Sequence, residues 1–196
     1  MKRFMMFAAV CMAAVSFAIA ADTAKIGKPA PAFELQDQNG KTVTLAEQKG
    51  KIVVLEWFNN ECPFVVRHYE KDKTMATLSD KYSSKDVVWL AINSTSGKKG
   101  DDNKKIAGDW SIKYPILSDS DGKVGKAYGA KSTPHMFIID KEGNLAYAGG
   151  IDNDPEGDKG DKRVNYVEKA LDELLDGKPV SEAQTKQYGC GVKYAK

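Results

Sequence analysis

A continuous apolar run at residues 52–55 limits the possible folds more than any other feature of this sequence. The run lies between Gly50 and the polar residues 59–61, and all four of its side chains are apolar, so no polar face alternates with an apolar one. Runs of this kind are typical of strands that are buried on both faces, as happens where helices cover a sheet. A second run at residues 87–92 has the same character and predicts another central strand.

The surrounding segments predict an alternation of strands and helices. Two hairpins are expected, the first pairing residues 33–35 with 42–45 and the second pairing residues 136–139 with 144–148. A short extended piece is expected at residues 114–117. Helical patterns are expected at residues 63–82, 106–110, 123–128 and 164–175. We therefore predict an α/β fold with a mixed sheet flanked by helices and with an N-terminal hairpin.

The first twenty residues have the pattern of a secretory signal peptide. Lys2 and Arg3 precede an apolar stretch that ends in small residues at Ala20, so we expect cleavage after Ala20 and a periplasmic or secreted protein. A membrane anchor is the alternative, but about 17 apolar residues are short for a bilayer span. Lipid attachment at Cys11 is a weaker alternative because Val10 precedes it. We expect membrane contact only through the export signal.

The remaining chain has room for one domain. Removing twenty residues from 196 leaves about 176, which suits one core and is too short for two ordinary ones. We divide the chain into a signal peptide (1–20), one domain (21–180) and a tail (181–196) that carries Cys190. The 29 basic and 27 acidic residues nearly balance and form no basic block, so no nucleic-acid partner is expected.

Two cysteines, Cys62 and Cys190, remain after cleavage. Two cysteines make no disulfide framework, so they are interpreted as reactive or redox-paired thiols. A closed zinc site needs four ligands, and His68 and His135 are the two histidines of the sequence. We therefore predict neither a metal nor a cofactor.

Cys62 falls where the strand at residues 52–55 gives way to a helix. A helix start offers unpaired N–H groups and partial positive charge, which lower the pKa of a cysteine there. Pro63 suits the first helical position, and Arg67 and His68 could add positive charge one turn on. We expect an activated thiolate within reach of solvent. The alternative is a buried structural cysteine, since free cysteine packs as a small hydrophobe.

Three segments together resemble a known family. Residues 53–58, followed after three residues by Cys62-Pro63, resemble the active-site segment of thioredoxins, with Cys62 as the attacking cysteine. Residues 132–134 (Ser-Thr-Pro) resemble the cis-proline loop that faces this cysteine. Residues 26–33 with Asn39-Gly40-Lys41 are similar to the start of the redoxin branch, which includes alkyl hydroperoxide reductases and thiol-specific antioxidants. The resemblance implies a thioredoxin-like, peroxiredoxin-like fold with a single active-site cysteine.

The sequence departs from both patterns at one position each. Thioredoxins have a second cysteine three residues after the first, where this chain has Val65. Peroxiredoxins have a threonine three residues before the cysteine, where this chain has Asn59, whose amide can still hydrogen-bond to a substrate. With Val65 in place, Cys190 is the thiol left to resolve an oxidised Cys62. It lies 128 residues downstream (190 minus 62), beside flexible glycines. A mixed disulfide with a partner is the alternative.

Other residues acquire roles through the resemblance. Glu56 corresponds to the buried acid that assists proton transfer in thioredoxins, unless it lies at a strand edge in water. Thr133 and Pro134 would pair with an extended substrate next to Pro63 and Cys62, while His135 is either packed or a proton carrier. Residues 152–158 partly match a calcium loop, but Arg163 stands where a bidentate Glu belongs, so we expect a solvated loop.

These features predict an exported thiol-dependent oxidoreductase. It would reduce a protein disulfide or a small peroxide through Cys62, with electrons from an unidentified thiol donor. A peroxiredoxin-type peroxidase is one alternative. A non-catalytic binding module with the same fold is the other, and the missing second cysteine near Cys62 supports it.

Overall fold

The computed structural model describes residues 23–195. The expected signal peptide, its cleavage site and Cys11 lie outside these residues. Across residues 23–195, no helix has the length and apolar character needed to span a bilayer.

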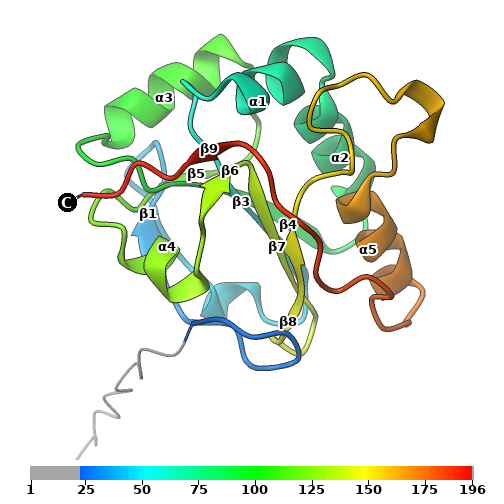
Figure 1. The fold of residues 1–196 in the computed structure, drawn as a ribbon. Coiled ribbons are helices and arrows are strands. Elements are labelled where there is room, and N and C mark those ends of the chain that lie inside the picture. Colours follow the sequence, from blue (N-terminus) through cyan, green and yellow to red (C-terminus); the bar gives the residue numbers. More distant parts are fainter. Residues whose placement is uncertain (1–22, 196) are drawn as a thin grey trace, which may run out of the picture.

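The elements follow the predicted alternation of strands and helices (Figure 1). The strands in the described part of the chain are β1 (Glu34–Gln36), β2 (Thr42–Thr44), β3 (Ile52–Trp57), β4 (Val87–Asn93), β5 (Ile116–Ser118), β6 (Ser132–Thr133), β7 (His135–Ile139), β8 (Leu145–Gly149) and β9 (Cys190–Gly191). The α-helices are α1 (Pro63–Val66), α2 (Thr74–Tyr82), α3 (Gly100–Asp109), α4 (Lys123–Tyr128) and α5 (Tyr166–Leu175). Shorter helical turns are η1 (Ala46–Gln48), the π-helical η2 (Arg67–Lys71) and η3 (Gly160–Lys162).

A mixed seven-stranded sheet confirms the predicted fold class. Its order is β2-β1-β5-β4-β3-β7-β8, with β3, β4 and β5 parallel and the two predicted hairpins antiparallel. The apolar run at residues 52–55 extends to Trp57 and forms β3, in which every residue is buried. β3 lies between β4 and β7, so the residues that follow it leave the middle of the sheet.

The core forms two apolar clusters because successive strand residues point to opposite faces. Ile52 and Val54 of β3 face a cluster that contains residues of α2 and α5. Val53, Leu55 and Trp57 face the other cluster, which includes Tyr128 of α4. Cys62 belongs to the first cluster, so the predicted nucleophile is on the same side of the sheet as α2 and α5.

Two helical predictions were wrong in their bounds. The helix expected at residues 106–110 begins at Gly100, since Asp102 accepts a hydrogen bond from the Lys99 N–H and Asn103 is buried against Asn93. The helix expected at residues 63–82 is divided into α1, η2 and α2. The break follows from Lys73, which has a left-handed φ of 53° just before α2.

The tail, which carries little sequence pattern, is part of the fold. It runs beside β8, where the Ala148 N–H donates to the Ala183 carbonyl oxygen over 3.0 Å. It then crosses the end of the sheet and forms β9, which pairs with β6 in a separate two-stranded sheet (Figure 1). Residues far apart in the sequence therefore meet near the end of β3.

Candidate functional site

Cys62 is the N-cap of α1, at the predicted strand-to-helix junction. Its carbonyl oxygen accepts from the Val66 N–H over 2.9 Å, and Pro63 occupies the first helical position. Asn59 shapes the turn before it, because the Asn59 carbonyl accepts from the Cys62 N–H and the Asn59 side-chain oxygen accepts from the Glu61 N–H. The side-chain oxygen of Asn59 is thus engaged within the turn, and a substrate-orienting role for this residue stays a prediction.

The loop at Thr133 and Pro134 faces the sulfur of Cys62. The peptide bond between Thr133 and Pro134 is cis, and Thr133 lies in β6. The Cys62 thiol donates to the Thr133 carbonyl oxygen over 2.9 Å. The structure therefore places the attacking group and the expected substrate-pairing edge within hydrogen-bonding distance.

Cys190 reaches the same point from the tail. It pairs in register with Thr133, whose hydroxyl also donates to the Cys190 carbonyl oxygen over 3.4 Å. Both thiols are free and they hydrogen-bond to each other. The structure thus brings together two cysteines that the sequence separates by 128 positions (190 minus 62).

The expectation that Cys62 is within reach of solvent was wrong. Its exposed fraction is 1%, and it packs in a cluster that Phe64, Tyr188 and Cys190 adjoin. The tail contributes to this burial, because β9 pairs with β6, whose Thr133 carbonyl oxygen contacts the sulfur.

The two thiols differ in acidity. Burial raises the pKa of Cys62, but hydrogen bonds from the Cys190 thiol, from Thr133 and from the Val65 backbone outweigh it, so the net pKa lies below its ordinary value. Burial and the neighbouring Cys62 sulfur raise the pKa of Cys190 to about 11. Cys62 is therefore the thiol that ionises first, with Cys190 as its hydrogen-bond donor.

Glu56 lies inside the protein, so the alternative position at a strand edge in water is excluded. Its carboxyl group accepts hydrogen bonds from Tyr69 (2.8 Å), Trp89 (2.9 Å) and Tyr114 (3.4 Å). Burial raises its pKa to about 7, against the lowering effect of these three donors. Among the described residues Glu56 forms no hydrogen bond to either cysteine, so its role in proton transfer stays a prediction.

His68 does not supply the expected positive charge, and His135 is a packed residue. Burial lowers the pKa of His68 to about 4, and burial together with the Lys131 charge lowers that of His135 to about 4. His135 packs at 4.4 Å from the Phe137 ring. The Arg67 guanidinium is turned to the Asp154 and Pro155 carbonyls, at 2.8 and 2.6 Å.

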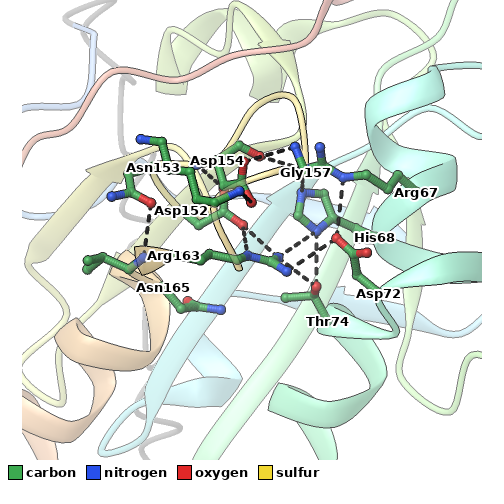
Figure 2. Close-up of polar contacts among 12 residues, drawn as sticks. Arg67, His68, Asp72, Thr74, Asp152, Asn153, Asp154, Gly157, Arg163 and Asn165 are labelled. Carbon is green, nitrogen blue, oxygen red and sulfur yellow. Dashed lines mark hydrogen bonds and ion pairs between the residues drawn. The ribbon is translucent and has the colours of Figure 1, made fainter. Parts of the chain in front are cut away.

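A buried polar cluster lies under the tail and was not predicted as part of the site (Figure 2). Asp152 accepts from Arg163 at 2.6 Å and from the Tyr188 hydroxyl at 2.6 Å, and His68 contacts both Thr74 and Tyr188. The prediction of a solvated loop was wrong for Asp152 and Asp154, because both side chains are buried.

Asp154 closes its own loop instead of facing water. Its carboxylate accepts from the backbone N–H groups of Gly157, Asp158 and Lys159. Across residues 23–195 no group of three or more His, Cys, Asp or Glu residues is arranged to hold a metal ion. The sequence signal for this cluster was the Asp-rich stretch at residues 152–158. Its spacing does not match a calcium loop, so another reason for the repeated Asp residues could have been sought.

A thioredoxin-like fold with an acidic cysteine next to a cis-proline defines the class: the protein is a thiol-based oxidoreductase. A profile of the AhpC/TSA family matches residues 26–148, and the chain belongs to this family. The match covers β1 to β7 and β8 as far as residue 148, while the tail with Cys190 lies beyond it.

Individual proteins agree with this assignment. The chain is 32% identical over 122 residues to the thiol-disulfide oxidoreductase ResA of Bacillus thuringiensis subsp. konkukian, covering 62% of this chain and 67% of that protein. It is 30% identical over 129 residues to the chloroplastic peroxiredoxin Q of Triticum aestivum, covering 62% and 57%. The crystal structure of an uncharacterized conserved protein from Geobacillus kaustophilus is similar with a TM-score of 0.77 and 32% identity, covering 87% and 93%.

Proposed function

We propose that this chain is an exported thiol oxidoreductase in which Cys62 attacks a disulfide or a small peroxide and Cys190 resolves the product. The observation that carries the proposal is the pairing of Cys190 with Thr133, which sets the second thiol beside the first. A thioredoxin places its second thiol three residues after the first, where this chain has Val65. The tail supplies the missing thiol.

The chemistry follows from the difference in acidity. With a peroxide, the Cys62 thiolate takes one oxygen and becomes a sulfenic acid while the alcohol or water leaves. The Cys190 thiol then condenses with the sulfenic acid, which forms a disulfide and releases water. With a disulfide, the Cys62 thiolate forms a mixed disulfide and expels a thiolate, and Cys190 displaces the second thiol. An external thiol donor returns the pair to the reduced state.

Glu56 is the group placed to exchange protons near neutral pH, since its pKa is raised to about 7. We assign it the role of a positioning and proton-buffering residue that acts through Tyr69 and Tyr114. Export is supported by the basic start and apolar stretch of the first twenty residues.

Mass spectrometry of the mature protein after brief treatment with hydrogen peroxide tests the pair. We expect a loss of about two mass units that disappears in Cys190→Ser, where sulfenic and sulfinic acids of Cys62 replace it. Sulfinic acid at Cys62 in both proteins would show that Cys190 does not resolve. No change in either protein, together with no reduction of a model disulfide, would favour the non-catalytic binding module.

The same protein separates the two substrate classes. A peroxidase consumes hydrogen peroxide rapidly in a reaction that Cys62→Ser abolishes. A disulfide reductase reacts faster with a peptide disulfide than with peroxide at equal concentration. Val65→Ser, one turn into α1, is a matched control because it alters the neighbourhood of Cys62 without removing a thiol.

A further inference from the structure

The tail is held on both sides of Cys190 by tyrosines. We call residues 188–194 the strap. At one end the Tyr188 hydroxyl donates to Asp152 over 2.6 Å, and at the other the Tyr194 hydroxyl donates to the Ala130 carbonyl oxygen over 2.8 Å. Between them the strap pairs with β6 along two residues. Two further backbone hydrogen bonds hold it, from the Ser96 N–H to the Lys193 carbonyl oxygen (2.8 Å) and from the Val192 N–H to the Lys131 carbonyl oxygen (3.3 Å).

The ladder between β6 and β9 is short enough to exchange. Two paired residues form few hydrogen bonds, and such segments open locally at a free-energy cost well below that of global unfolding. Once the strap has left, Ser132 and Thr133 lose the backbone partners that β9 supplied. An extended chain of another polypeptide can pair with that edge in the same way.

The side chain of Tyr188 has specific partners for both its ring and its hydroxyl group. Its ring centre lies 5.8 Å from that of Phe64 and 6.3 Å from that of His68. The hydroxyl donates its one hydrogen to Asp152 over 2.6 Å, and its oxygen also lies 2.9 Å from Nε2 of His68. Asp152 and His68 are themselves fixed by Arg163 and Thr74 (Figure 2). Phenylalanine would remove the hydroxyl's contacts with both groups, and would leave Asp152 one buried hydrogen bond short.

The position before the cysteine admits glycine alone. Gly189 has a φ of 117°, and a Cβ added to it would collide with the Thr133 carbonyl group and approach Pro134 Cδ at 3.3 Å. The colliding atoms are backbone atoms of Thr133, so a side-chain rotation cannot relieve the contact. The strap thus shows which residues this surface accepts at the two positions before the cysteine: a tyrosine and a glycine.

We propose that Phe64, His68, Asp152 and the Thr133 edge form a peptide-binding groove that selects an extended Tyr-Gly-Cys segment, with the strap as its tethered ligand. The inference rests on the proposed function of Cys62 and names its substrate class: a polypeptide disulfide whose cysteine follows glycine and an aromatic hydroxyl residue. The substrate strand enters the groove by replacing the strap.

The reaction that reports on the groove is a balanced thiol exchange. A synthetic peptide with the sequence of residues 186–193 carries its cysteine as a mixed disulfide with thionitrobenzoate. The Cys62 thiolate attacks the peptide sulfur, the bond between that sulfur and thionitrobenzoate breaks, and thionitrobenzoate leaves as a coloured thiolate. No further oxidant is needed, because one disulfide is exchanged for another.

The test uses the full mature chain with Cys190→Ser, so that Cys62 is its one thiol and the strap competes equally with every peptide. We expect the native peptide to release thionitrobenzoate at least about tenfold faster than peptides with Tyr188→Phe or Gly189→Ala, because the first loses the hydroxyl's contacts with buried Asp152 and His68 and the second introduces a backbone clash. A peptide with Gln187→Ala is the matched control and should react like the native one. In a protein that also carries Asp152→Asn, the preference for tyrosine over phenylalanine should shrink severalfold.

The outcomes separate the two proposals. If Cys62 reacts with free dithionitrobenzoate and all peptides react at one rate, the groove is refuted while the redox role of Cys62 stands. If Cys62 reacts with neither reagent, the proposed function fails and the groove falls with it. The peptide series needs one folded protein, so a folding defect in the Asp152→Asn protein does not remove the test.

Discussion

Two buried carboxyl groups lie in the core near the site, and they have opposite kinds of partners. Glu56 on β3 is surrounded by neutral donors, the two tyrosines and the tryptophan that hydrogen-bond to it. Asp152, after β8, is held by the Arg163 guanidinium at 2.6 Å and by the Tyr188 hydroxyl. Both carboxyl groups are buried, so the difference between them lies in charge and not in exposure.

The difference in partners indicates which of the two carboxyl groups can exchange a proton near neutral pH. A buried carboxylate without a cation is costly, so Glu56 binds a proton more readily and titrates near neutral pH. A carboxylate beside a guanidinium is fixed by a charge-assisted hydrogen bond and acts as an anchor. Asp152 therefore holds the tail in place, whereas Glu56 remains free to change its protonation state.

Removing the anchor should have the largest effect. Asp152→Ala removes the acceptor of Tyr188 and the more deeply buried of two carboxylate partners of Arg163, the other being Asp72 at 3.2 Å, and we expect a loss of about 3 kcal/mol in the free energy of unfolding. Urea denaturation monitored by tryptophan fluorescence measures this change. A loss below that of one ordinary hydrogen bond would show that Asp152 is not an anchor.

A comparable effect should appear at Glu56, but as a dependence on pH. The folded-state pKa of about 7 exceeds the ordinary 4.5, so the folded protein binds the extra proton and loses stability as pH rises between these values. The change amounts to about 3 kcal/mol and levels off above the folded pKa. Glu56→Gln should remove it.

The measurement for Glu56 is the difference in unfolding free energy between wild type and Glu56→Gln across this pH range. The subtraction is needed because His68 and His135, with pKa values lowered to about 4, shift stability in the opposite direction as pH rises. A difference that does not vary with pH would contradict the raised pKa of Glu56.

A smaller effect is expected from one of the neutral donors. Trp89→Phe removes the indole hydrogen bond to Glu56, which stabilises the ionised form, so the pKa of Glu56 should rise further. The expected loss is about 1–2 kcal/mol at alkaline pH and less at acid pH. Carbon-detected NMR titration of the carboxyl group measures the pKa, and Trp110→Phe, whose indole donates to the exposed Glu70, is the control.

The smallest effect sets the baseline for the comparison. Lys105 and Asp109 form an exposed ion pair one turn apart on α3. Asp109→Ala should change the unfolding free energy by less than about 0.5 kcal/mol, because water and salt screen such pairs. A loss as large as that of Asp152→Ala would mean that burial does not distinguish the two carboxylates.

The sequence predicted the central sheet and its junction with Cys62 because local patterns determine both. A few neighbouring residues are enough to predict the strand at residues 52–55 and the turn at Asn39-Gly40. The early start of α3 was missed because Asn103 is polar, and its burial depends on Asn93 and Ser118 from other elements.

The candidate site was only partly predictable. The contacts of Glu56 come from residues 13, 33 and 58 positions away, and no periodicity announces them. The tail forms a strand of two residues, too short to show alternation. Its fit to the body is visible only in three dimensions, where a Cβ at Gly149 or Gly150 would meet tail residues.

The number of residues in the tail also determines where Cys190 lies. The tail is fixed at Thr185, which hydrogen-bonds to Gly150 and Tyr147, and again at Tyr188, so the count of residues from there decides which atom arrives at Thr133. Successive residues of a strand point to opposite faces. Deletion of Gly189, the one residue between Tyr188 and Cys190, would therefore turn the Cys190 sulfur away from Cys62. Chain length in this short stretch therefore determines whether the second sulfur lies beside Cys62, as the proposed intramolecular disulfide requires.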